Sequence, residues 1–462
     1  MSDEVNTQQN GLKPFSTMQL LNFCLGFFGL QFAWQMRIIL SGPVTEALGA
    51  SPFIYGLIWL AGPFTGMVVQ PIIGILSDKT KSIFGRRRPY LLGGAIIASI
   101  ALWLFPNSGN ISNILTNVTG VNMPVWMGLF IAAVMIWIID ACINIAQGPY
   151  RALIPDVVPQ EQHSLANSYI SLAIGLGSVV AAGVAPFLKY VCKYDMPTVW
   201  QFVMAALTFT LAMLWTCLTI KERSTANDKT ETTEEKSESF WQSLKNFFAF
   251  SPEVPKICLM QFFTWIGMMC LLIYFTNFAI HTVYAVPDLS QANEALKNEY
   301  ANLVTKATYY SQICFAIFNL VCFLIAIPIG KIAEKKGNKR VHIFCLFSMM
   351  LAYLGMGLCK ESPIAVGIFM ALSGIGWASV CALPFAMLSK FIKKGTEGSV
   401  MGIFNIFIAG PQVFVCTLVA WLINKCPFMV GNEFNYHWEY SFFIGALMLA
   451  IAAAVTNKIN EN

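Results

Sequence analysis

The sequence predicts an all-α membrane protein with twelve transmembrane helices in two pseudo-symmetric six-helix bundles. The first observation is composition: 56% of the 462 residues are hydrophobic, 11% are charged, and the mean hydropathy is +0.61. An ordinary soluble domain has about 25% charged residues. The second observation is that apolar runs of about 20 residues recur, which is the length that crosses the hydrocarbon core as a helix. These two features exclude a soluble fold.

The apolar runs define the individual helices. The expected spans are 18–40, 53–76, 90–105, 125–148, 165–188, 199–220, 256–280, 309–330, 341–359, 364–388, 399–424 and 438–457. The thirteen cysteines lie mostly inside these runs without metal-type or paired spacing. They are therefore interpreted as small apolar residues, and we expect no metal site and no cofactor.

The third observation is the distribution of basic residues between the spans. The turn "SDKTKSIFGRRRPY", residues 77–90, carries five basic side chains, whereas the next turn, 106–124, carries no charge. Basic residues concentrate in cytoplasmic loops, so the alternation predicts that both termini are cytoplasmic. The net charge of +5 has this topological explanation and does not indicate nucleic-acid binding.

A polar, charge-rich stretch divides the chain. We expect an N-terminal six-helix bundle at 1–220, a cytoplasmic linker at 221–255 with a short surface helix at 240–250, and a C-terminal six-helix bundle at 256–462. A weak repeat supports the division: Gly74 and Gly330 each begin a segment with an acid and then a basic turn. Two similar halves are typical of a transporter that works by rocking.

Charged residues inside the spans are few and lie in the first half. Asp140, Asn144, Gln147 and Arg151 recur at spacings of 0, 4, 7 and 11. At about 100° per residue they share one narrow stripe of a helix, roughly 16 Å long. Lipid cannot solvate such a stripe, so it indicates a surface inside the protein or in contact with water.

This stripe predicts a ligand rich in hydroxyl groups. Carboxylate and guanidinium groups form strong hydrogen bonds with hydroxyls, and a partly desolvated carboxylate can bind a proton near neutral pH. We therefore expect Asp140 to be a proton site and Arg151 a sugar contact, with Asn144 and Gln147 beside them. The alternative is that Asp140 and Arg37 form a structural ion pair.

Further polar and aromatic residues in the spans are candidates for the same site. Tryptophan faces stack on sugar rings, and neutral amides can bind hydroxyls. The candidates are Gln31, Trp34, Gln35, Arg37, Trp59, Trp265, Asn277, Trp377 and Asn405. Thr264, Gln312, Asn319 and Gln412 are further neutral polar candidates. Packing and interhelical hydrogen bonding are the alternative role for each of them.

Four segments carry a family resemblance. They are "LQFAWQMRIILSGPVTEALG", "LIWLAGPFTGMVVQPIIGILSDKTKSIFGRRRPYLLGGA", "IDACINIAQGPYRALIPD" and "CALPFAMLSKF" with "GSVMGIFNIFIAGPQVF". The chain resembles the major facilitator superfamily, in particular its sucrose-transporter-like branch of proton–disaccharide symporters, near the glycoside–pentoside–hexuronide carriers. The resemblance implies the fold of that superfamily and transport of a sugar with a proton.

The resemblance also implies roles for particular residues. In this family the acid of the fourth span is the proton site and the arginine is the sugar contact, which match Asp140 and Arg151. The family's turn motif matches Gly74, Asp78, Gly85, Arg86 and Arg87. It implies a conformational latch between the halves, and the alternative is that the turn is only a topological anchor.

Two departures from the family pattern bear on specificity. Plant members carry a histidine in the first external loop, where this chain has "LGASPFIYG". Arg37 stands where plant members usually have glutamine. An arginine beside Asp140 would oppose its protonation.

The resulting hypothesis is a proton-coupled symporter that imports a disaccharide or small glucoside, such as a sucrose-like or maltose-like sugar, by alternating access. Facilitative or sodium-coupled glycoside transport, or an anionic sugar as cargo, are alternatives, and a sugar sensor is a more distant one. No enzyme motif is found. We expect a monomer in a bacterial inner membrane, with a sugar, a proton and the lipid bilayer as its partners.

Overall fold

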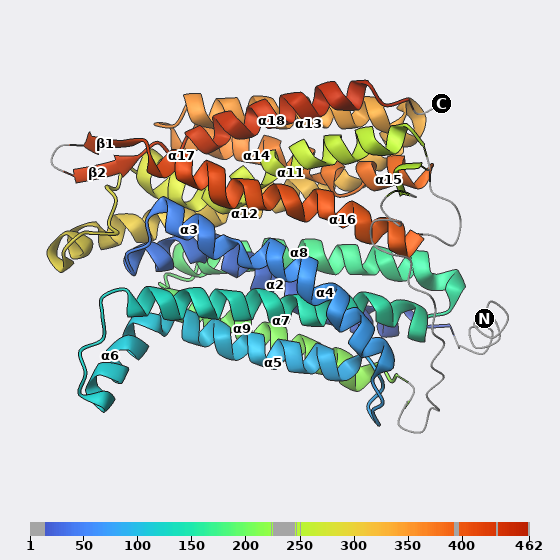
Figure 1. Cartoon of the computed structure of the whole chain (residues 1–462), viewed down its shortest axis with the longest axis horizontal. Helices are drawn as coiled ribbons and strands as arrows, with labels where there is room; N and C mark the ends of the chain where they lie inside the picture. The colour runs from blue at the N-terminus through green and yellow to red at the C-terminus, as the bar shows by residue number, and fades with distance from the viewer. Residues whose placement is uncertain are drawn as a thin grey trace. The chain divides into compact units, whose positions relative to one another are not determined.

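The computed structural model describes residues 14–222, 224, 245, 247–249, 251–391, 397–430 and 433–460. In these residues, twelve helical segments are long and apolar enough to cross a membrane. Figure 1 shows that the long helices of each unit run alongside one another within that unit. The predicted fold class, an all-α membrane protein with twelve transmembrane helices, is confirmed.

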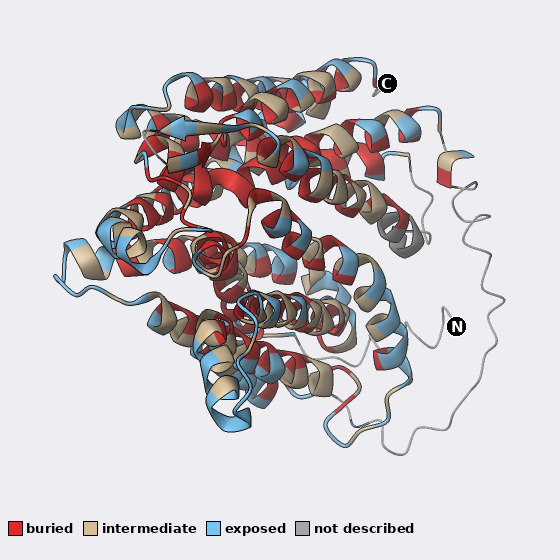
Figure 2. Ribbon diagram, turned by 60° about the vertical axis from the view of Figure 1, so that its left-hand side comes forward, coloured by how far each residue is buried: buried red, intermediate tan, exposed pale blue. Residues whose placement is uncertain are grey.

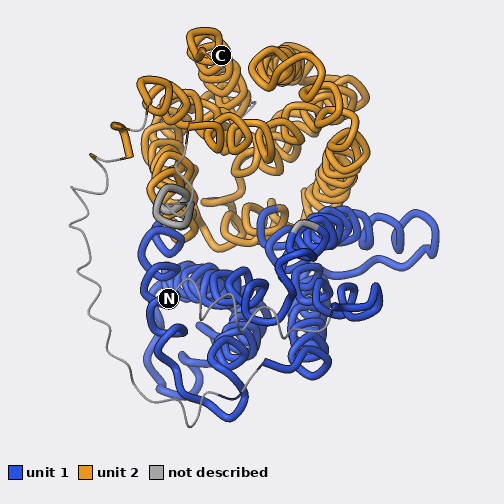
Figure 3. The backbone as a smooth tube through the Cα atoms, turned by 90° about the vertical axis from the view of Figure 1, so that its right-hand side faces the viewer, with its two compact units in different colours: residues 1–38, 64–231 blue, residues 39–63, 232–462 orange. Residues whose placement is uncertain are grey.

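The chain divides into two compact units (Figure 3). Unit 1 consists of residues 1–38 and 64–231, and unit 2 consists of residues 39–63 and 232–462. The predicted division into residues 1–220, 221–255 and 256–462 stays a prediction. The structure adds one feature to it, because the end of the first span and the start of the second belong to the unit that holds the C-terminal half.

Unit 1 contains most of two helices and all of several others. Its elements are α2 (Thr17–Ala47, up to residue 38), α4 (Ala61–Lys79, from residue 64), α5 (Arg88–Leu104), η1 (Phe105–Asn107), α6 (Ser108–Thr119), α7 (Met127–Val157), η2 (Gln160–Gln162), α8 (His163–Tyr190) and α9 (Thr198–Thr219). The turn predicted at 106–124 is therefore largely helical. Helix α6 lies at the end of unit 1 opposite the basic turn between α4 and α5.

Unit 2 contains the remaining elements. They are the end of α2, α3 (Pro52–Trp59), α11 (Glu253–Phe278), η3 (Ala279–Val283), α12 (Glu294–Lys336), α13 (Asn338–Leu358), α14 (Pro363–Val380), α15 (Leu383–Ser389), α16 (Glu397–Phe414), η4 (Val415–Val419), α17 (Ala420–Asn424), β1 (Pro427–Val430), β2 (Glu433–Tyr436) and α18 (Tyr440–Asn457). Strands β1 and β2 form an antiparallel hairpin in which Pro427 pairs with Tyr436.

Several predicted spans are interrupted in the structure. The second span is divided between α3 and α4, and the tenth between α14 and α15. The seventh and eleventh spans each contain a π-helical turn, η3 and η4. Hydropathy does not detect such interruptions, because the flanking residues remain apolar through each break. Single π turns inside α-helices occur often at functional sites.

Gly56 allows α3 to pack closely on the eleventh span within unit 2. A Cβ atom at this position would lie 2.3 Å from the carbonyl oxygen of Cys416 and 2.4 Å from the Cβ of Ala420. The hydroxyl of Tyr55, one residue earlier, donates a hydrogen bond to the carbonyl of Ile273 in α11 at 3.1 Å. Residues 39–63 are therefore held against α11, η4 and α17.

Buried residues follow one side of most helices (Figure 2), as expected for helices that pack on one another and also face lipid. One core of unit 2 includes Phe247, Val254, Ile257 and Phe404. Phe247 belongs to the surface helix predicted at 240–250, of which the structure describes residues 245 and 247–249, all helical. The rest of that prediction lies outside the described residues.

Candidate functional site

Helix α7 carries the predicted polar stripe in unit 1. It continues as a helix from Met127 to Val157 and includes Pro149 and Pro155. Along the stripe, Asp140 is buried, Asn144 and Gln147 are half-buried, and Arg151 is exposed. Access to the stripe therefore increases from the middle of the predicted span toward the end at which the basic turn lies.

Asp140 forms an ion pair with Arg37 of α2. The Nη2 atom of Arg37 lies 2.5 Å from the Oδ2 atom of Asp140, and the side chains are 1% and 3% exposed. The structure thus answers a question that the sequence leaves open. A buried pair needs close geometry to offset the loss of hydration of both charges, and removal of one partner leaves the other charge uncompensated.

Asn144 is held by hydrogen bonds to its neighbours. Its Nδ2 atom donates to the hydroxyl of Thr65 and to the carbonyl of Asp140, both at 2.9 Å, and its Oδ1 atom accepts a bond of 2.6 Å from Gln70. Thr65 and Gln70 lie on α4. The amide of Asn144 therefore fixes α4 against the segment of α7 that carries Asp140.

Arg151 is the accessible charge of the stripe. Within the described residues its guanidinium forms no hydrogen bond or ion pair, and its side chain is exposed. Gln147, one turn away, is half-buried and also has no hydrogen bond among the described residues. These two side chains are available to a ligand in the present structure, whereas Asp140 is not.

The predicted residues of α2 lie within six positions of Arg37, the partner of Asp140. Gln35 is 3% exposed, and its Nε2 atom has no hydrogen-bond partner among the described residues. Gln31 and Trp34 are half-buried. A buried amide donor without a partner is energetically unfavourable, so Gln35 is a group that a bound ligand or water would satisfy.

The predicted site residues of unit 2 lie on several of its helices. The rings of Trp265 and Trp377 meet edge to face, with centroids 5.8 Å apart. Trp59 is buried beside Tyr55, and Asn277 is 3% exposed with an unpartnered Oδ1 atom. Asn405 is half-buried.

Of the further neutral polar candidates, Thr264 is buried and donates to the carbonyl of Met260 at 2.9 Å, which leaves it no free donor. Gln312 and Asn319 are buried and Gln412 is half-buried. The amides of Asn319 and Gln412 donate to carbonyls of their own helices, at 2.8 and 3.1 Å. Such bonds fit the packing alternative.

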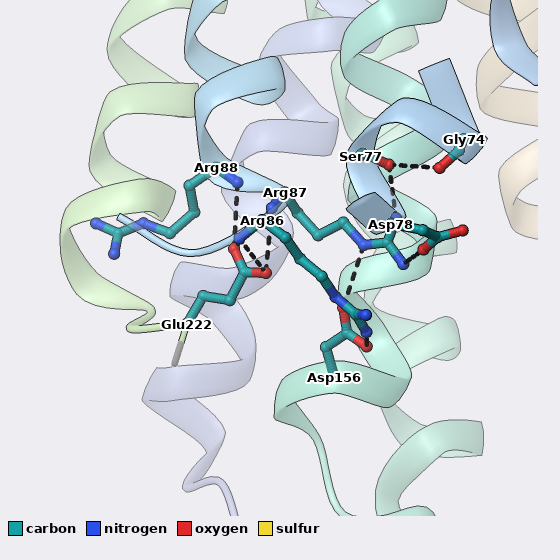
Figure 4. A network of polar contacts seen from close by, with 8 residues as sticks. All are labelled: Gly74, Ser77, Asp78, Arg86, Arg87, Arg88, Asp156 and Glu222. Carbon is teal, nitrogen blue, oxygen red and sulfur yellow. Dashed lines mark hydrogen bonds and ion pairs between the residues drawn. The ribbon is translucent and has the colours of Figure 1, made fainter. Parts of the chain in front are cut away.

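The basic turn forms an ionic network with Asp156 of α7 and with Glu222, which follows α9 (Figure 4). Arg87 lies 2.5 Å from Asp78 and 3.2 Å from Asp156, and it donates to the hydroxyl of Ser77 at 2.6 Å. Arg86 forms a bidentate pair with Asp156 at 2.5 and 3.2 Å. Ser77 in turn donates to the carbonyl of Gly74.

The carboxylate of Glu222 caps the start of α5. It accepts hydrogen bonds of 2.9 to 3.2 Å from the backbone N–H groups of Arg86, Arg87 and Arg88. Gly85 precedes them with φ +92°, and a Cβ atom there would lie 2.3 Å from Oε2 of Glu222. Glycine is required because of this conformation and because of this close approach.

Electrostatics hold the Arg86 side chain in its charged form. Burial lowers the pKa of the Arg86 guanidinium, but its hydrogen bond to Asp156 and the charges of Asp156, Asp78 and Glu222 raise the pKa above its ordinary value. All partners described for this network belong to unit 1. The network therefore joins α4, α5, α7 and the end of α9, and its predicted role as a latch stays a prediction.

Several site residues were not predicted. Thr65, Gln70 and Gln261 are polar residues in apolar runs, so the rule that identified Asn277 could have found them. Gln261 is fully buried, and neither side-chain polar atom has a partner among the described residues. Asp156 and Glu222 were not identified because their partners are 70 and 135 residues away. Among the described residues, no three His, Cys, Asp or Glu side chains are placed so that they could hold a metal ion together.

Comparison with known proteins identifies the family. The family model described as Major Facilitator Superfamily matches residues 23–415 and, in a second match, residues 310–457. The chain belongs to the Major Facilitator Superfamily. The resemblance predicted from the sequence is thereby confirmed, and so is the identification of the chain as a multi-pass membrane protein of this superfamily.

Two relatives of known name match this chain in sequence over most of their length. The "General alpha-glucoside permease" of Schizosaccharomyces pombe is 23% identical, over 88% of this chain and 87% of its own. The "Sucrose transport protein SUT5" of Oryza sativa is 26% identical, over 94% and 87%. These relatives agree with the sucrose-transporter-like branch. The crystal structure of a D-xylose–proton symporter matches with a TM-score of 0.66 and 17% identity, covering 96% of this chain and 98% of that one.

Proposed function

We propose that the chain is a proton-coupled sugar symporter that imports a disaccharide or small glucoside by alternating access. Membership of the Major Facilitator Superfamily supports a carrier without enzymatic activity. The names of the relatives, a sucrose transport protein and an α-glucoside permease, support a sugar as the cargo. Identities of 23 and 26% support the class of cargo, not one particular sugar.

One observation carries the proposal: helix α7 bears one charged residue that is buried in an ion pair and a second that is exposed without a partner among the described residues. Asp140 is sealed by Arg37, and Arg151 lies eleven residues further along α7 with an exposed guanidinium. The planar guanidinium presents several N–H donors in a fixed fork, which suits neighbouring hydroxyls of a sugar. Arg151 is therefore proposed as the sugar contact, with Gln147 as its neutral neighbour.

Proton coupling follows from competition for the Asp140 carboxylate. In the closed pair the carboxylate is ionised and binds the Arg37 guanidinium. A proton on Asp140 removes the charge that holds Arg37, so pairing and protonation exclude each other. The released guanidinium can then donate to another acceptor, such as a sugar hydroxyl. Proton binding and sugar binding would thus favour each other, as a symporter requires.

The remaining predicted contacts stay proposals. Gln31, Trp34 and Gln35 are proposed on α2, and the edge-to-face pair of Trp265 and Trp377 supplies aromatic surface on α11 and α14. Trp59, Asn277 and Asn405 complete the proposed set. Cytoplasmic termini, a monomer and a bacterial inner membrane are likewise part of the proposal.

A second candidate is a facilitative carrier. The ion pair of Asp140 with Arg37 favours it, because an arginine already supplies the positive charge that a proton would otherwise bring. Sodium coupling and an anionic sugar as cargo are separate alternatives. Two arginines on one cargo pathway would suit a carboxylate-bearing sugar.

Uptake into proteoliposomes distinguishes these candidates. Purified protein is reconstituted, and labelled sucrose, maltose, xylose and a glucuronide are offered under an inward proton gradient, an inward sodium gradient, or no gradient. We expect concentrative uptake of a disaccharide under the proton gradient alone. Equal uptake under all three conditions would instead establish facilitated diffusion, and preference for the glucuronide would establish an anionic cargo.

A further inference from the structure

A second cluster of titratable groups lies in unit 2, and none of its three members is a proposed sugar contact or the proposed proton site. Glu46 ends α2, His281 lies in η3, and Asp288 lies in the loop that leads to α12. The Oε2 atom of Glu46 is 2.7 Å from the Nε2 atom of His281, and the residues are 8% and 3% exposed. The cluster lies at the opposite end of α11 from the predicted linker.

The hydrogen bonds of His281 determine how its protons are arranged. Its Nδ1 atom lies 3.0 Å from the carbonyl oxygen of Val286. A carbonyl only accepts, so Nδ1 carries a hydrogen and donates it. The contact between Nε2 and Glu46 then contains one further proton, held by either partner. The other carboxylate oxygen of Glu46 accepts from the N–H of Leu289 at 3.1 Å.

Asp288 adds a second carboxylate. It accepts a hydrogen bond of 2.6 Å from the N–H of Ser290. Burial raises the pKa of Asp288 and the charge of Glu46 raises it further, whereas hydrogen bonding with Ser290 and the charge of His281 oppose the change. The pKa of the nearby Tyr436 hydroxyl is also raised, by burial and then by the charges of Asp288 and Glu46. The two carboxyl groups, Glu46 and Asp288, therefore outnumber the one basic group, His281, in this cluster.

A small cavity lies between these groups. It measures about 10 Å³, and its lining includes Glu46, Asp288, Asn277 and Trp438. Among the described residues, the Oδ1 atom of Asn277 and the Nε1 atom of Trp438 have no hydrogen-bond partner, although both residues are only 3% exposed. One of these atoms accepts and the other donates. A cavity of about 10–15 Å³ with two to four polar partners holds one water molecule.

We propose that Glu46, His281 and Asp288 form a proton-binding site that includes one water molecule in this cavity. The water accepts from Trp438 and donates to Asn277, which leaves it one hydrogen and one lone pair for the carboxylates. None of its three titratable groups is a proposed sugar contact, and Asp140 lies in unit 1. Asn277, which lines the cavity, is the one residue shared with the proposed sugar contacts. The site adds a second titrating centre to the chain.

The charge balance explains why the cluster takes up a proton. With both carboxylates ionised and His281 protonated, the three groups carry one negative charge in excess. Transfer of a proton from bulk water to Asp288 forms the neutral acid and cancels it. Among the charged groups nearby, Lys297 donates to the carbonyl of Ala47 at 3.4 Å and pairs with Glu294 at 3.4 Å. The raised pKa of Tyr436 keeps its hydroxyl in the neutral form.

Binding of this proton depends on residues 39–63 remaining packed on α11. The pKa of Asp288 is raised because the group is buried beside Glu46. If the end of α2 moved away, water would hydrate both carboxylates and the pKa would fall toward its ordinary value. The proton would then be released. Below the ordinary carboxyl pKa, Asp288 is protonated in both forms and favours neither. As pH rises through the raised pKa, the closed packing loses stability relative to the open form.

Infrared difference spectroscopy tests the site directly. The full-length protein in lipid nanodiscs is stepped from acidic to alkaline pH, and the C=O stretch of protonated carboxylic acid is recorded. Every variant is made in the R37Q/D140N background, so that the proposed proton site of unit 1 contributes no band. We expect a band that disappears as pH rises and is absent in D288N. In E46Q the midpoint of the band should move to lower pH by about one unit, because the charge of Glu46 no longer favours the acid.

E439Q is the matched control, because Glu439 lies in the same unit and pairs with Lys360 at 2.6 Å. It should leave the band unchanged. Persistence of the band in D288N, or an unshifted midpoint in E46Q, would overturn the proposal. So would loss of the band on addition of sodium at constant pH, since that would indicate a cation in the cavity. None of these outcomes bears on sugar uptake, so the symport proposal is tested separately.

Discussion

Arg37 and Arg151 illustrate how burial separates two chemically identical side chains. Arg37 is 1% exposed and bound to Asp140, whereas Arg151 is exposed and has no partner among the described residues. A buried arginine with a carboxylate partner neutralises that carboxylate. An exposed arginine at the end of the same polar stripe remains available for a cargo. The proposed function depends on this difference.

Replacement of Arg151 by lysine tests the proposed sugar contact. R151K keeps the charge but loses the planar fork of donors, so at least one charge-assisted hydrogen bond to the sugar is lost. A loss of about 1.5–3 kcal/mol corresponds to roughly a 10- to 100-fold weaker uptake. The measurement is the initial rate of labelled disaccharide uptake in proteoliposomes at several concentrations.

R340K is the matched control, because Arg340 is exposed on α13. It should transport at the wild-type rate. Wild-type uptake by R151K would exclude a fork-shaped contact with the cargo.

The sequence identifies a single functional residue when its type is unusual for its place in the chain. Asp140 and Arg37 were found because charges are rare in apolar spans. Their pairing was not predictable, because residues 103 positions apart in the chain come together only through helix packing. The same holds for Glu46 and His281, which are 235 positions apart.

At the scale of single elements, the capping of α5 shows how a charged turn becomes ordered. Three consecutive N–H groups at the start of the helix donate to Glu222. A helix N-terminus carries unpaired donors and a partial positive charge, so a carboxylate there is stabilising. Glu222 lies within the stretch predicted as a cytoplasmic linker, and composition alone gives no sign of this contact.

Neutralisation of Glu222 should destabilise the protein. E222Q keeps an acceptor oxygen but removes the charge that strengthens these hydrogen bonds and that balances three arginines. We expect a lower midpoint of thermal unfolding in detergent, with a loss of about 1–3 kcal/mol. The matched control is E299Q, because Glu299 is exposed on α12. Equal midpoints for E222Q and E299Q would show that the cap contributes no stability.

The sequence predicts the apolar part of each helix, because hydropathy marks only the residues that lie in the hydrocarbon. Helix α7 appears in the sequence as the span 125–148 and continues in the structure to Val157, because the polar stripe extends the helix beyond its apolar part. The π turns η3 and η4, helix α6 and the β1–β2 hairpin were not predicted. Their formation depends on packing within each unit and not on local hydropathy.

At the scale of the whole molecule, bilayer thickness makes the fold class predictable. A span must bury about 20 residues in hydrocarbon, and this requirement leaves a signal in any sequence that crosses the membrane twelve times. The assignment of residues 39–63 to unit 2 leaves no such signal. It depends on contacts such as Gly56 with Cys416 and Tyr55 with Ile273.

Counterflow and accumulation by D140N test the central claim most directly. With Asn at this position the side chain cannot bind a proton, so transport should be uncoupled from the pH gradient. D140N also leaves Arg37 buried without its partner, at a cost of about 3–5 kcal/mol. The double variant R37Q/D140N removes both charges and serves as the companion.

The measurement is performed on proteoliposomes under an imposed inward proton gradient. We predict that R37Q/D140N exchanges internal for external sugar but accumulates none above equilibrium, and that D140N likewise shows no accumulation. Sugar concentrated against its gradient by either variant would contradict the account, because the proton would then be carried without Asp140.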